Sequence, residues 1–169
     1  GGLIGYLSYD FGRRLERLPA LARDDLGLPD ADLGLYAWAL VSDHQRRLTH
    51  LVFHPCMAPR ERQRLVDLFD TPAAQTPSHF RLLAPMRGDL QANQYRQAFE
   101  QVQAYIQAGD CYQINLTQRF RAPCEGDPWH AYQALRRACP TPFSGCRRLP
   151  DGSALLSFSP ERFVRVSAG

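Results

Sequence analysis

Apolar and polar residues follow a helical rhythm most clearly between Asn93 and Ala108. In this stretch the apolar residues recur every three or four positions, which places them on one face of a helix. They are Tyr95, Ala98, Phe99, Val102, Tyr105 and Ile106. Gly109 stands where a left-handed residue commonly ends a helix. The pattern therefore predicts a helix over residues 93–108.

Two further helices are predicted from their first residues. Asp127 can accept a hydrogen bond from a first helical turn, and Pro128 suits the position after it. This helix should carry Trp129, Tyr132 and Leu135 and end before Pro140 and Pro142. Pro59 also suits a first turn, and Leu65, Leu68 and Phe69 mark one face of the helix that it begins.

A strict two-residue alternation marks Tyr112 to Phe120. One face of this segment is apolar apart from Gln118, with Tyr112, Ile114, Leu116 and Phe120. The other face is polar, with Gln113, Asn115, Thr117 and Arg119. Alternation of this kind predicts a half-buried strand.

Short apolar runs predict the remaining strands. They lie at residues 3–9, 35–41, 48–53, 143–149, 154–158 and 163–166, and the run at 35–41 reads as a buried strand. Turn residues at 43–46 and 150–152 predict two hairpins. Hairpins and helices without a regular βαβ alternation indicate the α+β class, with antiparallel sheets packed with helices.

A polar, proline-rich stretch at residues 71–78 predicts a connector, which extends to about residue 91. We therefore expect two regions, at residues 1–85 and 86–169. The second contains the more regular patterns.

Composition excludes several classes of protein. Hydrophobic residues make up 44% of the 169 residues and charged residues 22%, as in globular proteins, so a disordered chain is not expected. No apolar run is long enough to span a membrane, and no signal peptide is visible at the start. The five cysteines have no C-x-x-C spacing and the histidines no H-E-x-x-H spacing, so we expect reduced thiols, a cytoplasmic location and no metal site in these residues.

All twenty cationic residues are arginine, and the net charge is +3. The absence of lysine from the sequence excludes a Walker-type phosphate loop and a lysine nucleophile within these residues. The arginines are scattered in pairs and do not form a basic stripe, which argues against a nucleic-acid partner.

Three features could carry chemistry, and each has a plainer alternative. The polar face of Gln113, Asn115 and Thr117 could orient a ligand or simply face water. Glu161 closes an apolar strand, where a partly desolvated pocket would raise its pKa and make it a general acid; alternatively it is an exposed carboxylate paired with an arginine. Phe143, between extended proline-rich backbone and a strand, could face a planar ligand or belong to the core.

Three segments around these residues resemble the chorismate-using enzymes. They are GDCYQINLTQRF (109–120), PTPFSG (140–145) and LSFSPERF (156–163), in this order and spacing. The resemblance is to the aminodeoxychorismate synthase component I family, and the opening GGLIGYLSYD also resembles the end of that family's amino-terminal half. It implies the family's β-sandwich fold, with residues 1–85 ending the tryptophan-binding-like region and 86–169 beginning the chorismate-binding region.

The resemblance implies amination of chorismate at C4, in para-aminobenzoate and folate synthesis. Glu161 matches the acid that protonates the departing hydroxyl, and Gln113, Asn115 and Thr117 match the substrate-side strand. Pro142, Phe143 and Ser144 match a segment that contacts tryptophan, and Tyr112 could join it. Magnesium is the implied cofactor, with ligands outside this chain. A glutamine amidotransferase subunit is the implied partner, and L-tryptophan remains open as a ligand.

Departures from the family pattern matter as well. The family's catalytic lysine, in a P-I-K-G-T motif, and its magnesium-binding glutamates come later than these residues. The resemblance therefore implies an internal portion of the enzyme that cannot turn over chorismate alone. Anthranilate synthase component I remains an alternative, although Asn115 and the CPTPF segment favour the aminodeoxychorismate branch. A non-catalytic tryptophan-binding domain and a scaffold for a partner subunit also remain open.

Overall fold

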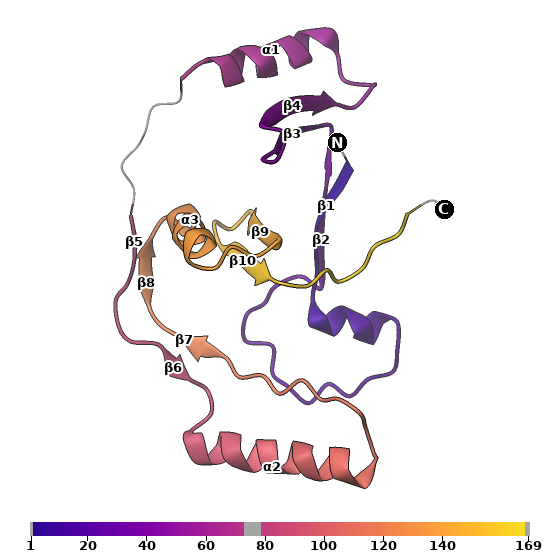
Figure 1. Ribbon diagram of the computed structural model, residues 1–169, viewed down its shortest axis with the longest axis vertical. Helices are drawn as coiled ribbons and strands as arrows, with labels where there is room; N and C mark the ends of the chain where they lie inside the picture. The colour runs from indigo at the N-terminus through magenta and orange to yellow at the C-terminus, as the bar shows by residue number, and fades with distance from the viewer. Residues whose placement is uncertain (1, 73–78, 168–169) are drawn as a thin grey trace. The chain divides into compact units, whose positions relative to one another are not determined.

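The computed structural model describes residues 2–72 and 79–167 (Figure 1). The chain forms two compact units, residues 1–75 and 76–169. Residues 73–78 of the expected connector lie outside the described residues. The assignment of residues 1–85 and 86–169 to two functional regions stays a prediction.

The first unit contains two antiparallel strand pairs. β1 (Gly2–Leu7) pairs with β2 (Ala31–Tyr36), and β3 (Trp38–Asp43) pairs with β4 (Leu48–Phe53). The second pair confirms the predicted hairpin. The prediction of one buried strand over residues 35–41 is wrong, because the chain bends at Ala37 and the residues on either side pair with different strands.

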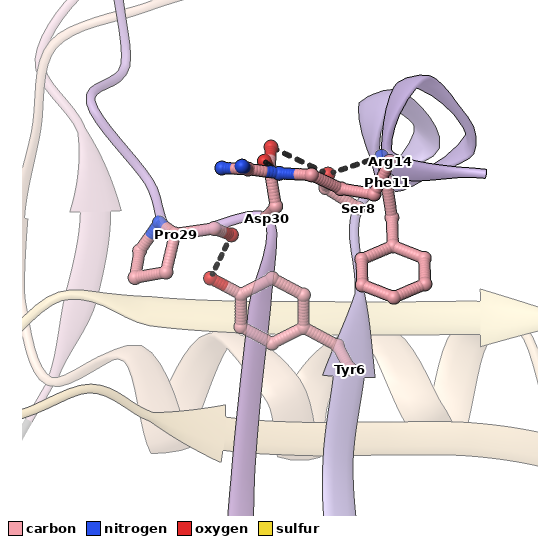
Figure 2. A network of polar contacts seen from close by, with 6 residues as sticks. All are labelled: Tyr6, Ser8, Phe11, Arg14, Pro29 and Asp30. Carbon is pink, nitrogen blue, oxygen red and sulfur yellow. Dashed lines mark hydrogen bonds and ion pairs between the residues drawn. The ribbon is translucent and has the colours of Figure 1, made fainter. Parts of the chain in front are cut away.

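A polar network fixes the chain where β1 ends (Figure 2). The Ser8 hydroxyl oxygen accepts a hydrogen bond from the Phe11 N–H at 3.1 Å and so caps the 3₁₀-helix η1 (Tyr9–Arg14). The Asp30 carboxylate accepts from the Ser8 hydroxyl at 3.5 Å and from Arg14 Nε at 3.0 Å. One carboxylate therefore joins the start of β2 to both ends of η1.

Helix α1 (Pro59–Asp70) begins at the predicted proline. Its Arg62 guanidinium donates to the carbonyl oxygens of Met57 at 2.8 Å and Pro55 at 2.7 Å, which holds the preceding loop against the helix. Near the other end of the helix, the Phe69 ring meets the Trp38 ring edge-on, with 5.8 Å between centroids. The helix thus contacts the β3–β4 hairpin through an aromatic pair.

The second unit begins with strands that the sequence patterns missed. β5 (Phe80–Leu82) pairs with β8 (Cys124–Gly126), and β6 (Arg87–Gly88) pairs with β7 (Phe120–Arg121). Residues 80–82 and 87–88 of the stretch expected to be a connector are therefore held by strand pairing within this unit.

Helix α2 (Ala92–Ala108) has the predicted extent and the predicted end. Gln94 Oε1 accepts a hydrogen bond from the Gln91 N–H at 2.8 Å at the start of the helix. Gly109 adopts a φ of 81°, and its N–H donates to the Ile106 carbonyl at 3.1 Å. A left-handed glycine of this kind satisfies a carbonyl that the helix leaves open.

Helix α3 (Pro128–Ala138) is capped by Asp127 as predicted. The Asp127 carboxylate accepts from the Trp129 N–H at 2.9 Å and also pairs with Arg148 on β9 (Phe143–Arg148). The cap residue therefore ties the start of α3 to a strand.

An aromatic stack joins α3 to β10 (Ala154–Ser159). The Tyr132 ring lies 5.3 Å from the Trp129 ring and 5.4 Å from the Phe158 ring, measured between centroids. Tyr132 is 7% exposed, and with Ala131 and Leu149 it forms the buried core of the described residues. The core therefore sits in the second unit, between α3 and the β9–β10 hairpin.

Burial is low for a chain of this size. The accessible surface is 14856 Å², whereas a compact 19.2 kDa monomer exposes about 8,400 Å² and two separate compact units of the same total mass about 10,000 Å². Even two independent units would thus bury several thousand Å² more. Large apolar side chains on several elements, including Leu35 at 81% exposure, lie open to solvent.

Two predicted strands do not form. Of residues 112–120 only Phe120 belongs to a strand, and residues 163–166 belong to none. A strand needs a partner for its N–H and C=O groups, and no strand among the described residues pairs with residues 112–119 or with residues 163–166. The α+β class is nonetheless confirmed, because the described strands form antiparallel pairs beside three α-helices. In the described part of the chain, no helix has the length and apolar character needed to cross a membrane.

Candidate active site

The β9–β10 hairpin brings together two of the motif segments. Its register places Phe143 opposite Ser159 and Ser144 opposite Phe158. The turn at residues 150–152 closes the other end, where the Asp151 carboxylate accepts from the Ser153 hydroxyl at 2.6 Å and from its N–H at 2.9 Å. The hydrogen bond from the Ser153 hydroxyl is the main cause of a lowered pKa at Asp151. Residues separated by sixteen positions therefore meet at the open end of the hairpin.

The segment entering β9 is held by its own side chains. The hydroxyls of Thr141 and Ser144 share a hydrogen bond of 2.6 Å, and the Ser144 hydroxyl lies 3.1 Å from the Thr141 carbonyl oxygen. Pro142 lies between them and restricts the backbone. Phe143 is therefore presented from a rigid segment, with 37% of its surface exposed.

The segment leaving β10 is held in a tight turn. The Ser159 hydroxyl donates to the Glu161 carbonyl oxygen at 2.9 Å, and its oxygen accepts from the Glu161 N–H at 3.3 Å. Pro160 fixes φ between these two residues. The backbone of Glu161 is thus constrained although its side chain is exposed.

Glu161 does not lie in the predicted desolvated pocket. The residue is exposed, and no ion pair to its carboxylate occurs within residues 2–72 and 79–167. Arg162, the adjacent arginine, instead places its guanidinium carbon 5.1 Å from the Phe143 ring centroid. Neither expected environment of Glu161 is therefore found, and its catalytic role stays a prediction.

The predicted substrate-side residues lie in a segment without strand pairing. The Gln113 amide donates to Asn115 Oδ1 at 3.4 Å, and Thr117 is exposed. Tyr112 is 100% exposed. No hydrogen bond, ion pair or ring contact in the described part of the chain joins these residues to Glu161. The hairpin therefore pairs Phe143 and Ser144 with Ser159 and Phe158, two and three residues before Glu161, and residues 112–117 belong to no such pairing.

An arginine–aspartate cluster nearby in the sequence was not predicted. Arg119 Nε donates to Asp89 at 2.9 Å, and Arg121 Nε donates to the same carboxylate at 3.0 Å. Hydrogen bonding from Arg119 is the largest cause that holds the pKa of Asp89 below its usual value, and Arg121 acts in the same direction. The position of Asp89 just before α2 was the one feature of the sequence that could have drawn attention to it. Its arginine partners lie about thirty residues later, so no local pattern connects them to it. Beside the cluster, Gln118 Oε1 is buried with no hydrogen-bond partner in the described residues.

Magnesium as a cofactor stays a prediction. Among them, no group of three or more His, Cys, Asp or Glu side chains is placed to hold a metal ion. Magnesium takes carboxylate and other oxygen ligands, and the resemblance implies that these lie outside this chain.

Comparison with a solved structure gives the class of fold. Anthranilate synthase component I from Streptococcus pneumoniae TIGR4 superposes with a TM-score of 0.75, covering 95% of this chain and 39% of that one at 23% identity. The chain therefore has an α+β fold shared with that protein.

Sequence comparison gives the family. Residues 1–169 match the family described as chorismate binding enzyme, and the chain belongs to this family. Aminodeoxychorismate synthase component 1 of Salmonella typhimurium is 44% identical over 100% of the chain, and that of Escherichia coli K12 is 42% identical over 97%. Anthranilate synthase component 1 of Thermus thermophilus is 34% identical over 98%. The chain spans only 35–36% of the length of these three relatives. The resemblance predicted from the three motif segments is confirmed.

Proposed function

We propose that the intact protein carrying this chain aminates chorismate at C4 to give 4-amino-4-deoxychorismate, for para-aminobenzoate and folate synthesis. The observation that carries the proposal is the 44% identity over the entire chain to a relative named aminodeoxychorismate synthase component 1. The relative from Thermus thermophilus named anthranilate synthase component 1 is 34% identical. The three motif segments lie within the matched residues.

In this proposal Glu161 is the general acid that protonates the departing C4 hydroxyl. A carboxylic acid performs this task best when its pKa lies near the working pH, which calls for a partly dehydrated site. Glu161 is exposed in this chain, so the cover must come from parts of the intact protein outside these residues. Gln113, Asn115 and Thr117 would supply neutral hydrogen-bonding groups toward the substrate.

The intact protein would also need partners. We propose a glutamine amidotransferase subunit as the ammonia source, since the relatives are named component 1. Magnesium belongs to the proposal with ligands outside these residues, and L-tryptophan is a candidate ligand of Tyr112, Pro142, Phe143 and Ser144. Free thiols at all five cysteines support a reducing, cytoplasmic location.

The test is product analysis on the full-length protein with chorismate, ammonium and magnesium. Formation of 4-amino-4-deoxychorismate supports the proposal, whereas formation of anthranilate places the protein in the other branch. Glu161→Gln keeps the shape of the side chain and removes the acid, so turnover should fall about 100-fold or more while chorismate still binds. Unchanged turnover in this variant would remove Glu161 from the mechanism.

Two controls separate the alternatives. The isolated 169-residue chain should form no product, and any chorismate- and ammonia-dependent product from it would contradict the proposed division of the site. Calorimetry of the full-length protein with tryptophan and with chorismate distinguishes an enzyme from a non-catalytic tryptophan-binding domain, which would bind only tryptophan. A scaffold for a partner subunit would bind neither.

A further inference from the structure

We propose that Arg162 is a positioning residue for Glu161, acting through its contact with the ring of Phe143. The inference rests on the proposed function, because it concerns the residue proposed as the acid. It starts from the observation that the side chain following Glu161 turns back onto the β9–β10 hairpin.

The first step is the geometry on the near side of Glu161. The Ser159 hydroxyl bonds to both the N–H and the carbonyl oxygen of Glu161, at 3.3 and 2.9 Å. Pro160 fixes one dihedral angle between them. These restraints hold the backbone of Glu161 on the side of β10 but do not reach the side chain of Arg162.

The second step is the geometry on the far side. The guanidinium carbon of Arg162 lies 5.1 Å from the centroid of the Phe143 ring, within the range of a cation–π contact. Phe143 lies opposite Ser159 in the hairpin register, so the contact links Arg162 to the strand residue paired with Ser159, where the turn begins. Glu161 is therefore held between two anchored neighbours.

The third step is the rigidity of the anchor. Phe143 lies between Thr141 and Ser144, whose hydroxyls are bonded at 2.6 Å, and it follows Pro142. A planar guanidinium on a ring held in this way restrains the backbone dihedral angles of Arg162, next to Glu161, more than a lysine ammonium would. Small displacements of a catalytic group reduce the rate strongly, so loss of this restraint should appear in kcat.

The experiment measures steady-state kinetics of the full-length protein without tryptophan. Arg162→Met and Phe143→Leu should each lower kcat about two- to fivefold with KM for chorismate unchanged. The double variant should lose no more than either single variant, because both changes break the same contact. Arg162→Lys keeps the charge and should recover part of the loss.

Arg165→Met is the matched control. Arg165 is an exposed arginine three residues further on, with no hydrogen bond, ion pair or ring contact within the described residues, and its variant should keep the full kcat. Wild-type kcat in Arg162→Met, losses that multiply in the double variant, or an equal loss in Arg165→Met would each overturn the inference.

A second measurement distinguishes failure of the inference from failure of the proposed function. The side-chain protons of Arg162 should show an upfield ring-current shift by NMR that disappears in Phe143→Leu. An active wild type without this shift overturns the inference alone. A wild type that makes no 4-amino-4-deoxychorismate overturns the proposed function, and the inference with it, whatever the spectrum shows.

Discussion

Replacing Tyr132 with alanine should strongly destabilise the second unit. Tyr132 is 7% exposed, and its ring contacts both Trp129 on α3 and Phe158 on β10. Truncation of a buried aromatic residue to alanine costs about 3–5 kcal/mol of unfolding free energy. About 1–3 kcal/mol of that belongs to the two ring–ring contacts.

Trp129 supplies the assay. The chain has two tryptophans, so in a Trp38→Phe background the fluorescence of Trp129 reports on the second unit alone. With a urea m-value of about 1–2 kcal/mol/M, the expected loss lowers the unfolding midpoint by about 1.5–5 M. If the unit is less stable than the loss, the Tyr132→Ala variant should be unfolded without urea.

Tyr132→Phe is the matched control, because it keeps the ring and removes only the hydroxyl. Its unfolding free energy should stay within about 0.5 kcal/mol of the parent. Equal midpoints for the alanine and phenylalanine variants would refute the conclusion that the stack forms the core of this unit.

Three further substitutions test other parts of the structure. Asp127→Ala removes the cap of α3 and should cost about 1 kcal/mol in urea unfolding, whereas Asp127→Asn keeps a capping oxygen and should cost less. Because the folded pKa of Asp89 is lowered, its charged form stabilises the fold above about pH 4, and that contribution is lost as the pH falls through the folded pKa. Asp89→Asn should therefore reduce the loss of stability toward acid pH, in unfolding measured between about pH 6 and 2.5. Gly126→Ala would place Cβ 1.9 Å from the His79 carbonyl oxygen at a φ of 101°, so the β5–β8 pair should separate and the amides of residues 80–82 should exchange faster with deuterium.

Local signals predicted the helices well. The glycine at 109 and the Asp127–Pro128 pair act within one helical turn, so the neighbouring sequence alone determines where α2 ends and α3 begins. The Pro59 start of α1 is of the same kind. These features depend on hydrogen bonds between residues a few positions apart, which a sequence pattern contains directly.

Strand pairing was predicted only where a short turn joins the partners. The hairpins at residues 38–53 and 143–159 have such turns, and both formed. The bend at Ala37 depends on β1, thirty residues earlier, and the alternation over residues 112–120 specifies a face without specifying a partner. Period-two patterns therefore predict the capacity to pair, while pairing itself is decided by distant residues.

The sequence predicted the hairpin that carries part of the candidate site, but not the surroundings of Glu161. The turn at 150–152 predicted that the strands at 143–149 and 154–158 pair, and in the hairpin Phe143 lies opposite Ser159. The stacking of Arg162 on Phe143 depends on how the chain turns after Pro160, which no periodicity encodes. The same holds for the exposure of Glu161, because burial depends on what covers a residue.

Each of the five sheets in the described part of the chain has two strands, and this has a practical consequence for handling the protein. A strand that is paired on one side only has a second edge, which can act as a template for pairing with another molecule. Apolar sequences such as ALLSFS in β10 favour such intermolecular stacking. Concentrated solutions of the isolated chain should thus form β-rich aggregates, and thioflavin fluorescence would follow their growth.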